Sequence, residues 1–316
     1  MKRVLCLYFS QTGQLENIVR SLTAPLAQDN RIELTLAPLK PLAAFPFPWP
    51  FTTFFNTFPE TVYSDPVAIE PLPFSDQQLA GFDLVIIAYQ VWFLSPSLPI
   101  ASFLQGPQAR PLLAGKPVIT VIGCRNMWLM AQETMKQRLA ELGARLIDNV
   151  ALTDSAGAAM SFISTPLWLL TGNKGPIGPI PAAGVAEHKI RAARRFGDAI
   201  VAALQQNDPL DAPLFRGLGA VEIHENLIAS EKVARRGFLL WGRLIRFVGR
   251  RAPLLRKPVV YLYVVYLVTL ILTVVPLSAL IKKLLSPLLK QRIQQQVAYF
   301  AEPSGNDTFN LPNGKP

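Results

Sequence analysis

A short loop near the N-terminus has the residue types of a phosphate-binding site. Residues 7–19 read LYFSQTGQLENIV, in which an apolar run ends at Phe9 and a segment with helical periodicity follows Gly13. The hydroxyls of Ser10 and Thr12, with the N–H groups at the start of the helix, could bind a phosphate dianion. The same residues also fit a plain strand-to-helix turn that caps the helix. Because no Walker lysine follows and no GxGxxG motif is present, a nucleoside triphosphatase and a dinucleotide Rossmann domain both fit poorly.

The residues able to do metal or thiol chemistry are few and scattered. Cys6 and Cys124 lie in apolar, strand-like stretches, and the sequence has no CxxC motif and no Cys/His cluster. This pattern supports neither a disulfide framework nor a structural zinc site, and it indicates a reducing compartment. His188 and His224 lie in late, charged stretches, where ordinary surface or core histidines are expected.

The elements that must position the loop form a regular alternation over residues 4–206. Short apolar runs rich in β-branched residues predict five strands, at 4–9, 33–37, 83–89, 118–123 and 146–152. Apolar residues at helical spacing predict the helices between them, at 14–27, 97–105, 128–142 and 184–206. Alternating strands and helices are typical of an α/β fold with a doubly wound parallel sheet.

Two insertions interrupt this alternation. The first, residues 38–74, contains LKPLAAFPFPWPFTTFFNTFPE, and its prolines argue against a regular helix. It is expected to be a loop that covers the sheet edge, or else an apolar lid or substrate wall, because so many aromatic side chains are rarely left in water. The second, residues 153–183, is expected to be a loop after the fifth strand that could close over the same site.

The positive charge of the chain is concentrated in its C-terminal part. Residues 213–292 carry 14 Lys/Arg against 3 Asp/Glu, the rest carries 17 against 18, and the net charge is +10. The same block holds the most apolar segment, so we expect contact with an anionic membrane surface and not with nucleic acid, for which no recognised motif is present. The start Met1-Lys2-Arg3 leads into only a short apolar run, so no signal peptide is expected and the first domain should stay in the cytoplasm.

The C-terminal part is predicted to form membrane-associating helices. Residues 207–257 should be a basic amphipathic linker with an interfacial helix. Residues 258–281 carry no charge and as a helix would reach about 36 Å, enough to cross a hydrocarbon core of about 30 Å. Because Pro276 could kink this segment, both a spanning and a monotopic arrangement stay open. We expect residues 258–289 to associate with the inner membrane and residues 290–316 to form a polar tail.

The N-terminal loop resembles the phosphate loop of flavodoxins. The sequence SQTGQ after VLCLYF is similar to the S/T-x-T-G-x-T sequence with which flavodoxins hold the phosphate of FMN. The resemblance implies a flavodoxin-like, doubly wound, five-stranded parallel sheet in a domain of residues 1–206. The phosphate-binding residues that it implies are Ser10, Gln11, Thr12, Gly13, Gln14 and Leu15. The family usually has Thr at the position of Leu15, so one hydroxyl ligand is missing.

Two further loops lie where flavodoxin-like proteins hold the isoalloxazine ring of FMN. YQVWFLSPSLP follows the third predicted strand and GCRNMW follows the fourth. The resemblance implies that backbone amides of both loops face the pyrimidine edge of the ring, at Gln90, Val91, Trp92, Phe93, Gly123, Cys124, Arg125 and Asn126. Trp92 and Phe93 would contact the flavin or, alternatively, pack against the proline-rich insertion.

No acid or base stands out for catalysis. Tyr89, Arg125 and Asp154 lie near predicted strand ends, and each also has an ordinary structural explanation. Arg125 would stabilise negative charge on reduced flavin or on an enolate substrate, or it would pair with a carboxylate. Cys124 is expected to be a small packing residue, because no visible motif places a base beside it.

A narrower resemblance covers the whole chain. YFSQTGQL, VWFLSPSLP and the basic, apolar C-terminal extension are similar to a bacterial group of flavodoxin-fold proteins encoded with ketosynthases for dialkylresorcinols. These are described as dialkylresorcinol-condensing enzymes or as the aromatase of that pathway. The resemblance implies a membrane-associated, FMN-dependent oxidoreductase that oxidises a lipid-like dialkylcyclohexanedione, with a ketosynthase as partner. The alternatives are an NAD(P)H-dependent quinone reductase, a membrane-tethered electron carrier and a flavin-free scaffold.

Overall fold

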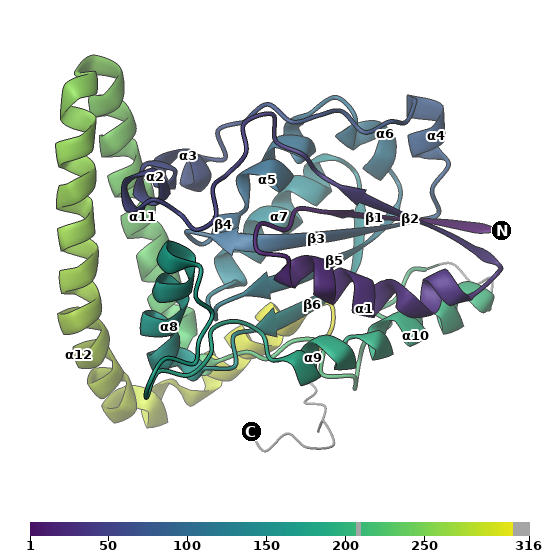
Figure 1. Ribbon diagram of the computed structural model, residues 1–316. Coiled ribbons are helices and arrows are strands. Elements are labelled where there is room, and N and C mark those ends of the chain that lie inside the picture. The colour runs from purple at the N-terminus through teal and green to yellow at the C-terminus, as the bar shows by residue number, and fades with distance from the viewer. Residues whose placement is uncertain (207–209, 306–316) are drawn as a thin grey trace.

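A doubly wound parallel sheet forms the centre of the molecule (Figure 1). The computed structural model describes residues 1–206 and 210–305. The parallel strands in these residues are β1 (Lys2–Tyr8), β2 (Ile32–Pro38), β3 (Leu84–Trp92), β5 (Pro117–Cys124) and β6 (Arg145–Thr153). They pair in the order β2-β1-β3-β5-β6, which is the strand order of flavodoxin-like sheets. The predicted fold class and all five predicted strands are confirmed, although β3 runs on to Trp92.

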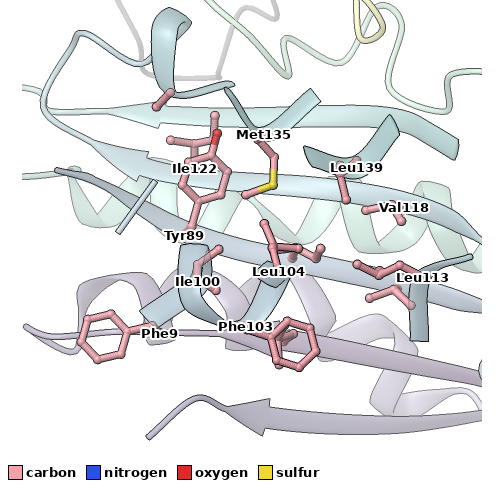
Figure 2. Close-up of a cluster of buried hydrophobic side chains, with 14 of the residues drawn as sticks. Phe9, Tyr89, Ile100, Phe103, Leu104, Leu113, Val118, Ile122, Met135 and Leu139 are labelled. Carbon is pink, nitrogen blue, oxygen red and sulfur yellow. The ribbon is translucent and has the colours of Figure 1, made fainter. Parts of the chain in front are cut away.

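Helices cover both faces of the sheet. One face carries α1 (Gln14–Gln28), α9 (Glu187–Ala192) and α10 (Arg194–Gln205). The other face carries α4 (Asp76–Ala80), α5 (Leu98–Gln105), α6 (Ala109–Leu113) and α7 (Leu129–Glu141). Along β1, Leu5 and Leu7 enter the second of these cores and Cys6 enters the first, as the alternation of side chains in a strand requires. Figure 2 shows the core under α5 and α7, with Tyr89 and Met135 at its centre.

The first insertion contains two short helices, α2 (Phe51–Asn56) and α3 (Phe58–Tyr63). The expectation that prolines prevent regular helix in residues 38–74 is therefore wrong for these segments. Pro50 is the N-cap of α2, and Pro59 lies in the first turn of α3. Backbone N–H groups at these positions have no partner within the helix, so proline starts a helix there without losing a hydrogen bond.

About half of the second insertion is helical, so the expected loop over residues 153–183 is wrong in part. It contains α8 (Gly157–Thr171), which includes Pro166. Gly172 adopts a left-handed conformation (φ 77°) and ends the helix, and the Gly/Pro-rich sequence follows it. The structure also has two separate helices, α9 and α10, in place of the single helix predicted over residues 184–206.

The C-terminal extension forms a helical hairpin of α11 (Glu225–Arg251) and α12 (Pro253–Ala301). Figure 1 shows it beyond the carboxyl ends of the strands. α11 contacts α3 and α7 as well as α12. The predicted linker is therefore mostly a long helix packed on the α/β domain. Residues 207–209, at the predicted domain boundary, lie outside the described residues.

The end of α12 returns to the sheet. Apolar side chains in its last turns join the core that includes α7, namely those of Ile293, Val297, Phe300 and Ala301. The polar tail predicted for residues 290–316 is therefore wrong as far as residue 305, and residues 306–316 lie outside the described part of the chain. The stretch Pro253–Thr273 is the one helical segment in the described residues that is long and apolar enough to cross a membrane. Only 11% of it is buried, whereas a core helix of a soluble protein is mostly buried.

Candidate functional site

The N-terminal loop connects β1 to α1 at the carboxyl edge of the sheet. Gly13 is the N-cap of α1 and has a left-handed backbone (φ 79°), which glycine adopts without a steric penalty. The Glu16 N–H donates to Ser10 Oγ over 3.1 Å, so Ser10 also caps the helix, as the alternative interpretation of the loop expected. Within the described residues, no hydrogen bond involves the Thr12 hydroxyl. This hydroxyl and the first amides of α1 are thus donors available to an anion.

The two glutamines of the loop have protein partners. Gln11 Nε2 donates to the Pro46 carbonyl (2.8 Å), and Trp49 Nε1 donates to Gln11 Oε1 (3.0 Å). Gln14 donates to the Val185 carbonyl (3.2 Å) and accepts from the Val185 N–H (3.0 Å). Their side chains therefore fix the loop between the first insertion and the segment before α9, and their backbone groups are the parts that can face a ligand.

The side chain of Leu15 belongs to the core and not to the phosphate site. It is 1% exposed and packs on β5, where a Cβ at Gly123 would lie 3.1 Å from Leu15 Cδ1. A Cβ there would also lie 3.3 Å from Ile18 Cδ1. The absence of a side chain at Gly123 therefore lets α1 approach the sheet closely. Of Leu15, only the backbone N–H can contribute to anion binding.

The loop after β3 has an unusual backbone. Val91 and Trp92 pair with the two-residue antiparallel strand β4 (Ser95–Pro96), which makes a tight hairpin. Phe93 (φ 48°) and Leu94 (φ 58°) at its turn both have a left-handed backbone, a conformation that residues other than glycine rarely adopt. Gln90 Oε1 is buried without a hydrogen-bond partner among the described residues. Strained backbone and an unpaired buried acceptor are both typical of ligand-binding loops.

An aromatic cluster covers the same edge. Trp92 lies edge-on to Phe9 (5.8 Å between ring centroids), Phe45 (5.0 Å) and Trp49 (5.6 Å). Phe93 contacts aromatic rings of α2 and α3. Both residues therefore pack against the first insertion, as one of the two interpretations of the sequence expected. The insertion forms an apolar wall beside the loop.

The two insertions meet above this edge. The backbone N–H of Trp49 donates to the Leu169 carbonyl of α8 (2.7 Å), and the ring centroids of Phe47 and Trp168 are 6.1 Å apart. Their contact agrees with the expectation that both insertions lie over the same part of the sheet. With the Gln11 and Gln14 contacts, it encloses the N-terminal loop between them.

The loop after β5 faces α8. Arg125 lies over the Phe162 ring with its guanidinium carbon 3.9 Å from the centroid, and Asn126 Nδ2 donates to Ser161 Oγ (3.0 Å). Burial lowers the pKa of the Arg125 guanidinium. In residues 1–206 and 210–305, no carboxylate pairs with it, so one of the roles left open by the sequence, an ion pair, is not observed. A desolvated, unpaired guanidinium is suited to stabilising an anion.

The other catalytic candidates have structural roles. Tyr89 is 0% exposed in the core, where its hydroxyl donates to Gln132 Oε1 (2.6 Å), so it is not placed to contact a substrate. Asp154 is buried and accepts from Thr165 Oγ1 (3.0 Å) and from the Gly184 N–H (2.8 Å), which ties the ends of the second insertion together. Burial raises the pKa of the Cys124 thiol, which fits a packing residue.

Sequence reasoning missed Glu231, a buried carboxyl group on α11. Glu231 Oε1 accepts from the Met130 N–H at the start of α7 (2.7 Å), and Oε2 has no partner in the described residues. Burial raises its pKa to about 8. Four residues later, Arg235 donates to Ser95 Oγ (2.5 Å) in the loop after β3. No local pattern signals these contacts, because each joins α11 to a residue more than a hundred positions earlier in the chain.

Solved structures similar to this chain include flavoproteins and flavodoxins. A flavoprotein from Lactobacillus acidophilus in complex with FMN is 16% identical, with a TM-score of 0.38 over 47% of this chain and 92% of its own. Flavodoxin 1 from Bacillus cereus is 13% identical (TM-score 0.35, 64% and 98%), and a WrbA-like flavodoxin from Agrobacterium tumefaciens is 9% identical (0.37, 66% and 100%). No protein-family model and no curated protein matches the sequence. At these identities and TM-scores the likeness carries no functional argument, and the fold assignment rests on the strand order.

Proposed function

We propose that the protein is a membrane-associated, FMN-dependent oxidoreductase that acts on a lipid-like cyclic substrate. The observation that carries the proposal is the loop of residues 10–15. It brings the Thr12 hydroxyl, which has no partner in the described part of the chain, and the first amides of α1 to the carboxyl edge of a flavodoxin-like sheet. Hydroxyls and helix N-terminal amides suit a phosphate dianion. The residues present therefore fit the phosphate of FMN, although the family's second threonine is replaced by Leu15.

The chain's own groups have distinct roles in this proposal. Ser10, Thr12 and the amides of residues 12–15 would hold the phosphate. The unpaired Oε1 of Gln90 would accept a hydrogen bond from an N–H of the ring. When bound, FMN supplies a hydride acceptor. Arg125 would stabilise the negative charge of an enolate substrate.

The finer proposal for the reaction is the oxidation of a dialkylcyclohexane-1,3-dione to a dialkylresorcinol. This conversion removes two hydrogens from the ring, one as a hydride and one as a proton from carbon beside a carbonyl group. The carbonyls make that proton acidic, and a guanidinium such as Arg125 would favour the enolate that remains. The aromatic wall of Phe45, Trp49 and Trp92 would exclude water from an apolar substrate. A ketosynthase is the class of enzyme that would supply such a diketone.

The first test is to purify the full chain in detergent, record its visible spectrum and identify any released cofactor. The proposal expects FMN at one equivalent. Thr12→Val should weaken FMN binding about tenfold, because it removes one hydrogen bond to a charged group. Thr35→Val, the same change in the edge strand β2, is the control and should leave binding unchanged. A colourless protein that takes up no added FMN would refute the proposal.

The same sample separates the enzymatic alternatives. Reduction of the bound flavin by a dialkylcyclohexanedione, with a resorcinol as product, would support the aromatase reaction. Reduction by NADPH followed by reoxidation with a quinone would favour the quinone reductase instead. If neither the diketone nor NADPH reduces the bound flavin, the result would favour the membrane-tethered electron carrier.

A further inference from the structure

Both flanks of the apolar helix are fixed to the same α/β domain. Before it, Glu231 on α11 accepts a hydrogen bond from the Met130 N–H of α7. After it, Ser304 Oγ accepts from the Asn149 N–H of β6 (2.9 Å), and Phe300 is buried in the core. A segment that crosses a bilayer once leaves its flanks on opposite sides. The two anchored flanks are incompatible with that arrangement.

A second crossing does not resolve the conflict. α12 is one continuous helix from Pro253 to Ala301, and a continuous helix cannot cross and return. The described residues contain no second candidate span. The spanning arrangement that the sequence left open is therefore disfavoured, and the hairpin must meet a membrane from one side.

The inner face of the hairpin is occupied by the first insertion. Phe58 of α3 stacks on Tyr263 of α12 with ring centroids 4.1 Å apart. Arg256 pairs with Glu60 (2.7 Å), and Arg246 on α11 pairs with an aspartate of the insertion. Among the described residues, these contacts leave the opposite, outer face of α11 and of residues 253–273 without a protein partner.

The outer face is strongly apolar. Leu254, in the first turn of α12 at the tip of the hairpin, is 91% exposed. Large apolar side chains continue from the tip along both helices, including Leu240, Phe247, Leu262, Val265 and Leu272. An exposed apolar patch that follows two adjacent helices is far larger than the scattered apolar residues of an ordinary surface.

Basic residues accompany this apolar face. The sequence from residue 232 to residue 301 contains 13 Lys/Arg and no Asp or Glu. Arg243, Arg250, Arg251 and Lys257 are exposed near the tip. Long basic side chains extend toward anionic headgroups while neighbouring apolar groups enter the acyl region. This charge complementarity identifies an anionic lipid leaflet as the occupant of the face.

We infer that the α11–α12 hairpin lies in one leaflet of an anionic bilayer and does not cross it. The carboxyl edge of the sheet then faces the lipid, since the hairpin packs directly on α3 and on the loop after β3. The inference rests on the proposed function for its membrane setting, but it does not depend on FMN. A lipid-like substrate would reach the site from the leaflet without passing through water.

Vesicle binding of the full chain tests the surface. Vesicles of phosphatidylcholine with phosphatidylglycerol should bind the protein, and pure phosphatidylcholine vesicles or high salt should weaken binding. Leu254→Glu with Leu262→Glu should weaken it at least tenfold. Arg250→Gln and Arg251→Gln should each weaken it about fivefold. The matched control is Leu42→Glu, which changes a residue that is 67% exposed outside the hairpin and should have no effect. Equal binding by all variants would overturn the inference.

Label accessibility tests the topology. Leu254→Cys and Thr273→Cys, at the two ends of the candidate span, are labelled separately with a dye that external dithionite reduces. Dithionite added outside preformed vesicles should reduce both labels, whereas protection of either label would show a crossing and refute the inference. FMN content is measured on the same samples. Protein that binds FMN but not vesicles would refute the inference and the membrane association in the proposed function, and it would leave the flavin-dependent reaction standing. Protein that binds vesicles but not FMN would refute the flavin-dependent reaction and leave the inference standing.

Discussion

Replacing Glu231 with Gln should change the pH dependence of stability. The carboxyl group is 0% exposed, and burial raises its pKa from 4.5 to about 8. Between these pH values the folded protein holds the proton and the unfolded chain releases it. Stability from this group is therefore fully present below pH 4.5 and is lost as the pH rises to 8. Gln keeps an acceptor for the Met130 N–H but does not titrate.

The size of the effect follows from the pKa difference. One pKa unit is about 1.4 kcal/mol, so ionisation of this group in the folded state costs on the order of 5 kcal/mol in total. Between about pH 5.5 and about pH 8, the free energy of unfolding of the wild type should therefore fall by about 3 kcal/mol because of this group, and that of the variant should not. Other buried groups, such as Asp148, titrate equally in both proteins and cancel in the difference.

Unfolding of the full chain in detergent, measured at several pH values in this range, tests the prediction. The stability of Glu231→Gln relative to wild type should rise with pH, whatever constant offset the new amide introduces. The control is Glu225→Gln, which changes an exposed carboxylate on the same helix and should run parallel to wild type. Parallel curves for Glu231→Gln and wild type would refute the assignment of a protonated carboxyl group.

Three further predictions concern packing and charge. Gly197→Ala should destabilise the protein by about 3 kcal/mol in denaturant unfolding, because the new Cβ would overlap the Leu22 carbonyl oxygen of α1; a loss under about 1 kcal/mol would contradict this. Phe58→Ala should lower the free energy of unfolding by about 3 to 5 kcal/mol, because it leaves a cavity against Tyr263. An unchanged melting temperature would contradict that packing. Arg125→Gln should lower the reduction potential of bound flavin, because it removes a cation that would stabilise negative charge on reduced flavin. An unchanged potential would show that Arg125 does not act on the ring.

The sheet and the position of the N-terminal loop could be predicted because both depend on local pattern. β1, β3 and β5 are buried on both faces and are apolar over most of their length, which marks them in the sequence. β2 and β6 include polar residues, and their place in the alternation of strands and helices marks them instead. The turn at Gly13 follows the first strand directly, so its place at the carboxyl edge follows from the fold class. α8 was not predicted, although its sequence is mostly apolar and Pro166 lies within the helix without ending it.

The long-range contacts could not be predicted in the same way. The role of Glu231 depends on a hydrogen bond to a residue about a hundred positions away, and no spacing rule signals such a pair. The return of α12 did leave a signal, because Ile293, Val297, Phe300 and Ala301 have the spacing of one helix face. That signal lies within residues 290–316, which were predicted to form a polar tail and include the sequence QRIQQQ.

The return of α12 to the sheet also has a consequence for how the protein is made. Phe300 and Ala301 complete a core that begins with β1, so this core cannot close until ribosomes have synthesised the whole hairpin. The apolar helices therefore emerge before this core is complete, although all five parallel strands precede them in the chain. A fragment cut before α11 would leave residues of this core exposed to water. The hairpin is thus an internal part of the domain and not an appendage to it.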